Sequence, residues 1–403
     1  DYNTGWMNGD IKLATLSDND TTNAVGAELI TNGTFASNTT GWTSNSAGTF
    51  TSSGGVGVLT NTTQGDRCRI FDDFTTVVGK SYTLQFQIVS GSMFFHISNG
   101  STNYVSNLGS TPGYYTYTII ATTTTTYLQA GNYSVTNGDT SSIDNISMRL
   151  AEADRSFNNN GVQVFGTVTK AAVATGAELV KYSGFSASNY LKYPSSTDLS
   201  FGAGDFCLIM WMEPTSTTSG YSFEQGYGIR IAYTANRVRF HVYGNGLTPQ
   251  FTDSVTLPPV NSWHQMVFLR RNGLLEMYCD GEDCAGTVHS SATQTFSNAT
   301  TTVIGTSGST NYQGALALVR LGGTPPTQEQ IKKMYNDEKH LFKENAKATL
   351  YGTSDAVTAL AFDDDTELLH VGTSAGRSDF QGLRRVNNTT RAIGTAISAV
   401  DGF

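Results

Sequence analysis

The sequence predicts an all-β fold built from antiparallel sandwiches, and three observations support that prediction. Glycine fills 42 of the 403 positions, and only 14% of the residues carry a formal charge. Ser, Thr and Asn are abundant; Ser and Asn compete with the helical backbone for hydrogen bonds, whereas Thr, Tyr and Phe suit a pleated sheet. Short alternating runs, separated by Gly, Asn and Ser at a spacing of roughly 8–12 residues, are typical of sandwich strands.

The charge pattern argues against two classes of partner. Lys and Arg number 24 against 33 Asp and Glu, and the net charge is −9. The basic residues are scattered and form no stripe, so we expect no nucleic acid partner. The longest near-apolar run, Phe206–Met212, is far shorter than the roughly 20 residues that cross a bilayer, so we expect no membrane insertion.

Both ends of the chain suggest a segment of a longer protein. The sequence begins at Asp1 without a methionine and stops at Phe403 without a closing helix or polar tail. Residues 1–25 are expected to form a strand or hairpin that belongs to a larger β-structure.

A first sandwich is expected over residues 26–150. The run Ser81–Ile88 alternates polar and apolar side chains, as a half-buried strand does. The opening Glu28–Phe35, the pair Gly41-Trp42 and the closing Ile143–Met148 resemble the jelly-roll carbohydrate-binding modules of the galactose-binding-like superfamily. The resemblance implies that the first and last strands pair, and that they often share a structural calcium.

A second sandwich is expected over residues 151–323. Both faces of Phe206–Met212 are apolar, so both are expected to be covered. The strings NYLKYP, GDFCLIMWMEP, SWHQMVFLRRNGLLEMYCDG and TTTVIGTSGSTNYQGALALVRL resemble the laminin-G-like, concanavalin-type jelly roll. The resemblance implies the fold and says little about a ligand.

One amphipathic helix is expected within residues 324–347, where Thr327 and Gln330 have the spacing of a capping box. Residues 348–403 alternate like successive strands with tight turns and resemble one blade of a β-propeller. If the first twenty residues belong to an adjoining blade strand, the two sandwiches and the helix are an insertion in a β-propeller-like region.

Carbohydrate binding requires aromatic faces beside Asn, Asp and Gln side chains near a sandwich edge or loop. Ordinary packing is the alternative for each aromatic residue. The candidates are Tyr104, Tyr114, Tyr115 and Tyr133 in the first sandwich, and Tyr221, Tyr227 and Tyr312 in the second.

Two further features concern metal binding and redox state. Asp144 and Asp280 are the candidate ligands for a structural calcium, because sandwich-edge sites use oxygen ligands from loops. Cys279 and Cys284 flank a short turn, and they either form a disulfide across a hairpin or face a core as small apolar residues.

No catalytic residues are expected. A glycosidase needs a pair of carboxylates, and no strand carries alternating acidic residues that would face one cleft. The G-x-S-x-G pattern at Gly372–Gly376 precedes a strand-like run, whereas a nucleophile elbow requires a helix there.

The segments DYNTGWMNGDIKLATLSD and ENAKATLYGTSDAVTALAFDDDTELLHVGTSAGRSDFQGLRRVNNTT resemble tail proteins of marine bacteriophages. The resemblance implies a non-enzymatic structural protein of the virion tail, exposed to the medium. Its partners would be further copies of itself, other tail proteins and a host-surface glycan. The alternatives are an extracellular filament or adhesin protein, and a polysaccharide-degrading enzyme whose catalytic domain lies outside this segment.

Overall fold

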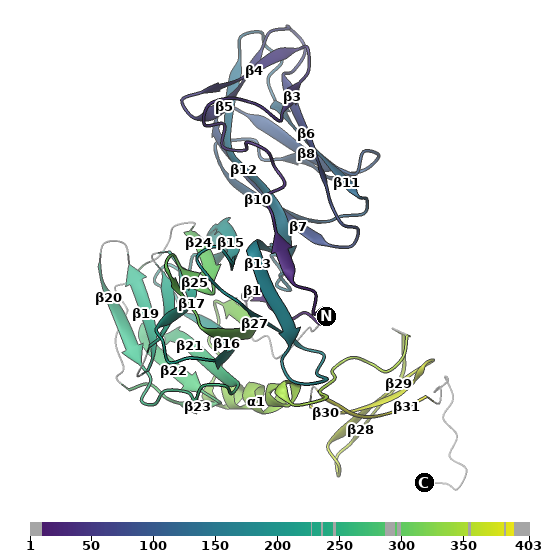
Figure 1. Cartoon of the computed structure of the whole chain (residues 1–403), viewed down its shortest axis with the longest axis vertical. Coiled ribbons are helices and arrows are strands. Elements are labelled where there is room, and N and C mark those ends of the chain that lie inside the picture. The colour runs from purple at the N-terminus through teal and green to yellow at the C-terminus, as the bar shows by residue number, and fades with distance from the viewer. Residues whose placement is uncertain are drawn as a thin grey trace.

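The computed structural model describes residues 10–226, 228–234, 237–244, 247–286, 295, 300–353, 356–382 and 384–390. These residues form antiparallel sheets with one α-helix, which confirms the all-β prediction. Figure 1 shows two sandwiches, with the helix along the lower side of the second and a separate four-stranded sheet beside it. No helix in the described ranges is long and apolar enough to cross a membrane.

The first sandwich packs two five-stranded antiparallel sheets face to face. One sheet has the order β4 (Gly48–Ser53), β5 (Val56–Asn61), β12 (Thr140–Glu152), β7 (Ser81–Ser90), β10 (Gly113–Ile120). The other has the order β3 (Thr43–Ser44), β6 (Arg69–Thr75), β11 (Thr125–Asn132), β8 (Met93–Ser98), β9 (Asn103–Leu108).

The core of the first sandwich comes from the alternating apolar positions of both sheets. Phe86 of β7 stacks on Phe95 of β8 with ring centroids 3.7 Å apart. The opening segment lies against β12, because Leu29 N–H donates to Met148 O at 3.0 Å and Ile146 N–H donates to Gly33 O at 3.0 Å.

The second sandwich also has two layers. One contains β1 (Ile11–Thr15), β27 (Gly314–Gly322), β16 (Phe206–Pro214), β21 (His264–Arg271), β22 (Leu274–Cys279) and β23 (Glu282–Asp283), with β14 (Val180–Ser183) also on β27. The other contains β2 (Ala24–Gly26), β13 (Val162–Ala172), β15 (Tyr190–Ser196), β24 (Thr300–Ile304), β17 (Gly220–Gln225), β18 (Ile229–Tyr233), β19 (Val238–Gly244) and β20 (Leu247–Asp253). Short strands β25 (Thr306–Ser307) and β26 (Thr310–Asn311) and the 3₁₀ turn η1 (Thr197–Leu199) complete it.

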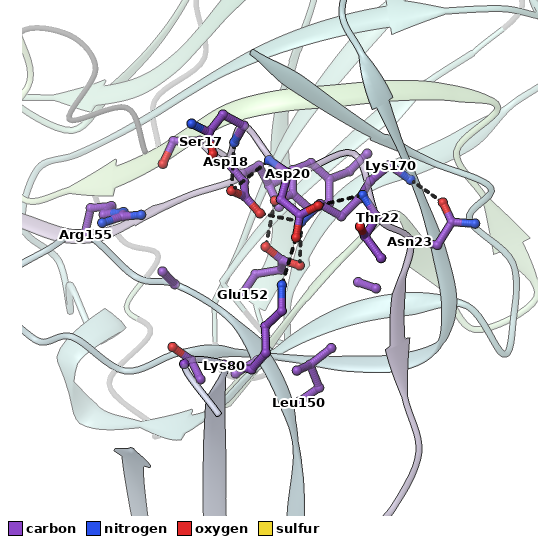
Figure 2. A pocket seen from close by; sticks show the side chains of 18 residues that line it. Ser17, Asp18, Asp20, Thr22, Asn23, Lys80, Leu150, Glu152, Arg155 and Lys170 are labelled. Carbon is purple, nitrogen blue, oxygen red and sulfur yellow. Dashed lines mark hydrogen bonds and ion pairs between the residues drawn. The ribbon is translucent and has the colours of Figure 1, made fainter. Parts of the chain in front are cut away.

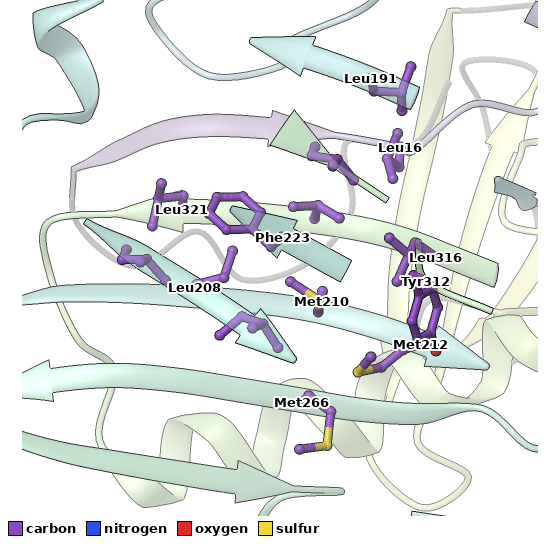
Figure 3. Close-up of a cluster of buried hydrophobic side chains, with 14 of the residues drawn as sticks. Leu16, Leu191, Leu208, Met210, Met212, Phe223, Met266, Tyr312, Leu316 and Leu321 are labelled. Carbon is purple, nitrogen blue, oxygen red and sulfur yellow. The ribbon is translucent and has the colours of Figure 1, made fainter. Parts of the chain in front are cut away.

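Both faces of β16 are buried, as its sequence predicts. Leu208, Met210 and Met212 point between the layers toward side chains such as Phe223 (Figure 3). The alternate residues Cys207, Ile209 and Trp211 point the other way, toward the helical segment.

The amino-terminal segment corrects one prediction. β1 pairs with β27, and Leu13 and Leu16 are buried in the core of the second sandwich. The described residues before position 26 therefore belong to the second sandwich and not to the C-terminal sheet. The first sandwich is inserted between β2 and β13 of the second.

The predicted helix is α1 (Gln328–Glu338), continued by the 3₁₀ turn η2 (Lys339–Phe342), and the predicted capping box of Thr327 and Gln330 is present. At its end Glu338 is fully buried. It accepts hydrogen bonds from Arg320 at 2.5 and 2.8 Å and from Trp211 Nε1 at 2.7 Å. This paired carboxylate fixes the helix on the outer side of the sheet.

The C-terminal sheet is an antiparallel meander of β28 (Val357–Asp363), β29 (Leu368–Thr373), β30 (Gly376–Gln381) and β31 (Arg384–Thr389). The G-x-S-x-G segment forms the turn between β29 and β30, with Thr373 paired to Gly376. Leu360 and Phe362 are 67% and 60% exposed, so this sheet leaves apolar surface uncovered. Its relation to a propeller stays a prediction.

Candidate carbohydrate-binding face

The strand order of the second sheet of the first sandwich gathers polar and aromatic side chains on its outer face. Alternate residues of a strand point to opposite sides, so the partners of one register row share a face. One row across β6, β11, β8 and β9 is Asp73, Tyr127, Ser98 and Asn103. The next row, across β3, β6, β11 and β8, is Thr43, Phe71, Gln129 and His96. We call these eight residues the outer face.

The outer face surrounds a shallow hollow of about 170 Å³, and all eight of its residues line it. Tyr127 is 44% exposed. A Cβ atom at Gly100 would lie 2.9 Å from the Tyr127 ring, so the ring rests on the β8–β9 turn, which limits its movement. The arrangement offers an aromatic surface for stacking beside carboxylate, amide and hydroxyl groups for hydrogen bonding.

An aromatic cluster lies beside the outer face at one end, with the Phe94 ring at its centre only 4% exposed. Phe94 lies on the same side of β8 as His96, and their ring centroids are 5.0 Å apart. Tyr133 contacts Phe94 edge-on at 5.7 Å, and the Arg67 guanidinium lies 6.0 Å from both the Phe94 and Tyr133 rings. Tyr133 is thus the predicted tyrosine that the structure places beside this face.

The other tyrosines predicted for the first sandwich do not converge on it. Tyr104 is partly buried, and its hydroxyl accepts a hydrogen bond from Thr122 N–H at 2.8 Å. Tyr115 stacks on Phe86 with centroids 5.2 Å apart and packs against the core. Tyr114 is 52% exposed, but it lies on β10 of the opposite sheet.

In the second sandwich the predicted tyrosines are also separated. The Arg230 guanidinium lies 5.0 Å from both the Tyr221 and Tyr243 rings and pairs with Glu224. The prediction for Tyr312 is wrong, because its side chain is 1% exposed and lies in the core (Figure 3), where burial raises the pKa of its hydroxyl. Tyr227 lies outside the described residues.

The structure places the two predicted calcium ligands in different sandwiches, and calcium binding at either one stays a prediction. Asp144 accepts a hydrogen bond from the Asn145 amide at 3.0 Å, and the described residues bring no group of His, Cys, Asp or Glu ligands around it. Asp280 lies far along the chain, where a histidine and a cysteine face it.

The disulfide alternative for Cys279 and Cys284 is also corrected. Both are free thiols packed against the core of the second sandwich. Cys279 pairs with Glu282, while Cys284 N–H donates to Met277 O at 3.0 Å, so the two cysteines are diagonal and not directly opposite. Diagonal residues of a hairpin stand too far apart for a bond that needs Cβ atoms about 4 Å apart.

A larger pocket of about 340 Å³ lies where the two sandwiches meet; we call it the junction pocket (Figure 2). Lys170 forms ion pairs with Asp18 and Glu152, and Tyr182 donates to Glu152 at 2.7 Å. Burial is the largest influence on Glu152 and raises its pKa. Because these charges pair with one another across the junction, the pocket is better suited to holding the sandwiches together than to binding a ligand.

The residues at the centre of the outer face, among them Tyr127, Gln129 and His96, were not predicted as binding residues from the sequence. Each one alternates with a core residue of its own strand, and this alternation is the only local signal they give. Their convergence depends on the order β6-β11-β8, which joins segments far apart in the sequence.

Several solved structures are similar to parts of this chain. The receptor-binding domain of botulinum neurotoxin C/D mosaic serotype is 10% identical, with a TM-score of 0.40. The match covers 57% of this chain and 59% of that domain. The binding domain of Paraclostridial Mosquitocidal Protein 1 is 11% identical, with a TM-score of 0.41. The match covers 56% of this chain and 61% of that domain. Domain 4 of AbnA, a GH43 extracellular arabinanase from Geobacillus stearothermophilus, is 14% identical, with a TM-score of 0.37 and coverage of 45% of this chain and 92% of that domain.

The chain spans about three fifths of the two toxin domains. No curated protein sequence matches it. Residues 185–332 match the family model of the concanavalin A-like lectin/glucanases superfamily. Those residues comprise most of the second sandwich and the first turn of α1, so this part of the chain is similar to laminin-G-type, concanavalin A-like domains.

Proposed function

We propose that the chain binds carbohydrate through the outer face of the first sandwich. One observation carries the proposal: the register of β6, β11 and β8 places Tyr127 and His96 around the same hollow as Asp73 and Gln129. No hydrogen bond within the described residues engages the side chain of Asp73, Tyr127 or Gln129, so these groups are available to a sugar.

The shape of the site favours a surface-bound glycan over an enclosed small molecule. The hollow is shallow and open, so a chain of sugar units can lie across it with its ends in solvent. Such a site buries little area and binds weakly, and useful strength comes from several copies acting together.

The wider role that we infer is a non-enzymatic structural protein of a phage tail that recognises host-surface glycans as a homo-oligomer with other tail proteins. The resemblance of the first and last segments to phage tail proteins supports this role. The lectin-type fold of the second sandwich agrees with it.

Glycan binding by matched variants tests the binding site. The chain is applied to a glycan array, and the strongest glycan is then titrated against the unmodified chain, Tyr127→Ala and Tyr114→Ala. Loss of one stacking ring is expected to weaken binding about tenfold, which is about 1.4 kcal/mol. Tyr114→Ala is the control, because Tyr114 is 52% exposed, against 44% for Tyr127, but lies on the opposite sheet. Equal loss in both variants, or no binding to any glycan, would contradict the proposal.

Two further measurements address the alternatives. Release of reducing sugar from host polysaccharide by this chain would contradict the non-enzymatic role. Electron microscopy of the assembled protein separates a closed ring or cone, expected for a tail component, from an open helical filament.

A further inference from the structure

A nitrogen, a thiol and a carboxylate meet at the edge of the second sandwich, far from the outer face along the chain. His264 begins β21, Cys279 ends β22 and Asp280 opens the turn that follows. One ligand atom from each lies within 4.8 Å of the other two. His264 Nδ1 and Asp280 Oδ2 are 2.8 Å apart.

The hairpin geometry produces this meeting. Met266 pairs directly with Cys279, so His264 and Cys279 are diagonal neighbours on the core-facing side of the sheet. Asp280 has a φ of 54°, in the left-handed region, and its N–H donates to Gln265 O at 2.9 Å. This tight turn directs the carboxylate back toward the histidine.

Neighbouring groups hold both His264 and Asp280 in place. Gln265 N–H donates to Asp280 Oδ1 at 2.9 Å, which leaves Oδ2 for His264. On the far side of the ring, His264 Nε2 lies 2.8 Å from Ser262 Oγ, and Ser262 donates to Pro259 O at 3.1 Å. Since the Ser262 proton is used on Pro259, the hydrogen between Ser262 and His264 comes from Nε2.

This assignment has a consequence for the other ring nitrogen. With Nε2 facing Ser262, Nδ1 is the ring nitrogen that faces the carboxylate of Asp280. The 2.8 Å between Nδ1 and Oδ2 is a hydrogen-bond distance, so a proton lies between these atoms and a metal ion would take its place. A metal-bound histidine has this arrangement, with one nitrogen on the ion and the other donating to a fixed acceptor.

We propose that His264, Cys279 and Asp280 bind a zinc ion through Nδ1, Sγ and Oδ2. Zinc accepts nitrogen, sulfur and oxygen ligands together, whereas calcium requires oxygen alone. The sequence predicts Asp280 as a calcium ligand, whereas this proposal assigns the carboxylate to zinc. A water molecule completes the fourth position, because the Asp280 side chain is 29% exposed and opens the site to solvent.

Binding is an exchange of one metal ion for protons. The Cys279 thiol loses its proton to solvent and becomes the thiolate ligand, and His264 binds through an unprotonated Nδ1. The ion would join the ends of β21 and β22 and so stabilise the fold in proportion to its occupancy.

Zinc and cobalt titrations of the reduced, metal-free chain test the proposal. Competition with a chromophoric chelator is expected to show one zinc ion per chain, and cobalt is expected to give a thiolate-to-metal absorption band. Cys279→Ala is expected to weaken zinc binding at least tenfold and to remove the band. Cys284→Ala is the matched control, because Cys284 is a partly buried thiol of the same hairpin outside the group. It is expected to keep both.

Three results would overturn the zinc site. The unmodified chain could bind no stoichiometric zinc, which would leave a protonated His264 paired with Asp280. Cys279→Ala could retain full affinity and the cobalt band. The two cysteine variants could lose zinc equally while their circular dichroism stays unchanged, which would place the ion elsewhere on the hairpin.

Discussion

The two sandwiches share an architecture and differ in what covers one sheet. In the second, Ile209 and Val267 on the outside of a sheet are buried under Ile331 and Met334 of α1. In the first, the corresponding outside of a five-stranded sheet stays open and carries Tyr127, surrounded by polar groups. The comparison teaches that a sheet covered by a helix gains buried apolar surface, whereas an uncovered sheet with a polar outside stays accessible, as the proposed glycan site requires.

The two sandwiches also differ in the hydrogen-bond partners of their buried carboxylates. In the second sandwich, Glu338 at the end of α1 has Arg320, Trp211 and Gln265 of the covered sheet as partners. Asp72 lies on the core-facing side of β6, and its Oδ2 is buried without a hydrogen-bond partner. Burial raises the pKa of Asp72 to about 6.

The largest effect on stability is expected when the paired carboxylate of Glu338 is removed. Glu338→Ala leaves the buried Arg320 charge without its partner, and we expect the free energy of unfolding to fall by about 3–5 kcal/mol. Urea unfolding measures the change. Asp337→Ala, which removes the exposed pair with Lys333, is the control and should cost less than about 1 kcal/mol. A small effect of Glu338→Ala would mean that apolar packing alone holds the helix.

A smaller effect with a distinctive pH dependence is expected at Asp72. In the folded protein its carboxyl keeps a proton up to about pH 6, whereas the ordinary value is 3.8. Folding therefore becomes less favourable as the pH rises from about 4 to about 6. The Asp72→Asn variant keeps its free energy of unfolding over this range, because its side chain does not titrate. The variant should be more stable by on the order of 1–2 kcal/mol at pH 8, since the site is only partly buried, and nearly unchanged at pH 4. Thermal unfolding at both values checks this, and an equal difference at both would contradict it.

The smallest effect concerns the aromatic end of the outer face. Arg67 lies against Phe94 and Tyr133 and donates from Nε to Tyr133 O at 3.0 Å. Arg67→Ala should loosen both rings and weaken glycan binding two- to fivefold, which corresponds to about 0.5–1 kcal/mol. Titration of the same glycan used for Tyr127→Ala measures it. No change would limit the binding site to the hollow itself.

Local features of the structure were predictable from the sequence. The capping box at Thr327 depends on residues three apart, and the buried faces of β16 depend on alternation within one strand. Both are set by short-range geometry, which a sequence shows directly.

Features that depend on distant segments were not predictable. The pairing of β1 with β27 joins residues about three hundred positions apart, so the first segment was placed with the wrong unit. The same limit applies to the candidate site, because no local pattern distinguishes Tyr127, which lines the hollow, from Tyr312, which is in a core.

The insertion of the first sandwich has a mechanical consequence. Two chain crossings join it to the second sandwich, one after β2 and one between β12 and β13. β12 and β13 are also hydrogen-bonded to each other where Ala151 pairs with Gln163. A pull on the first sandwich is therefore shared between two covalent tethers and a ladder of hydrogen bonds loaded together. A domain attached in this way resists rotation relative to its neighbour. A force on a glycan bound to the first sandwich would therefore be transmitted to the second sandwich.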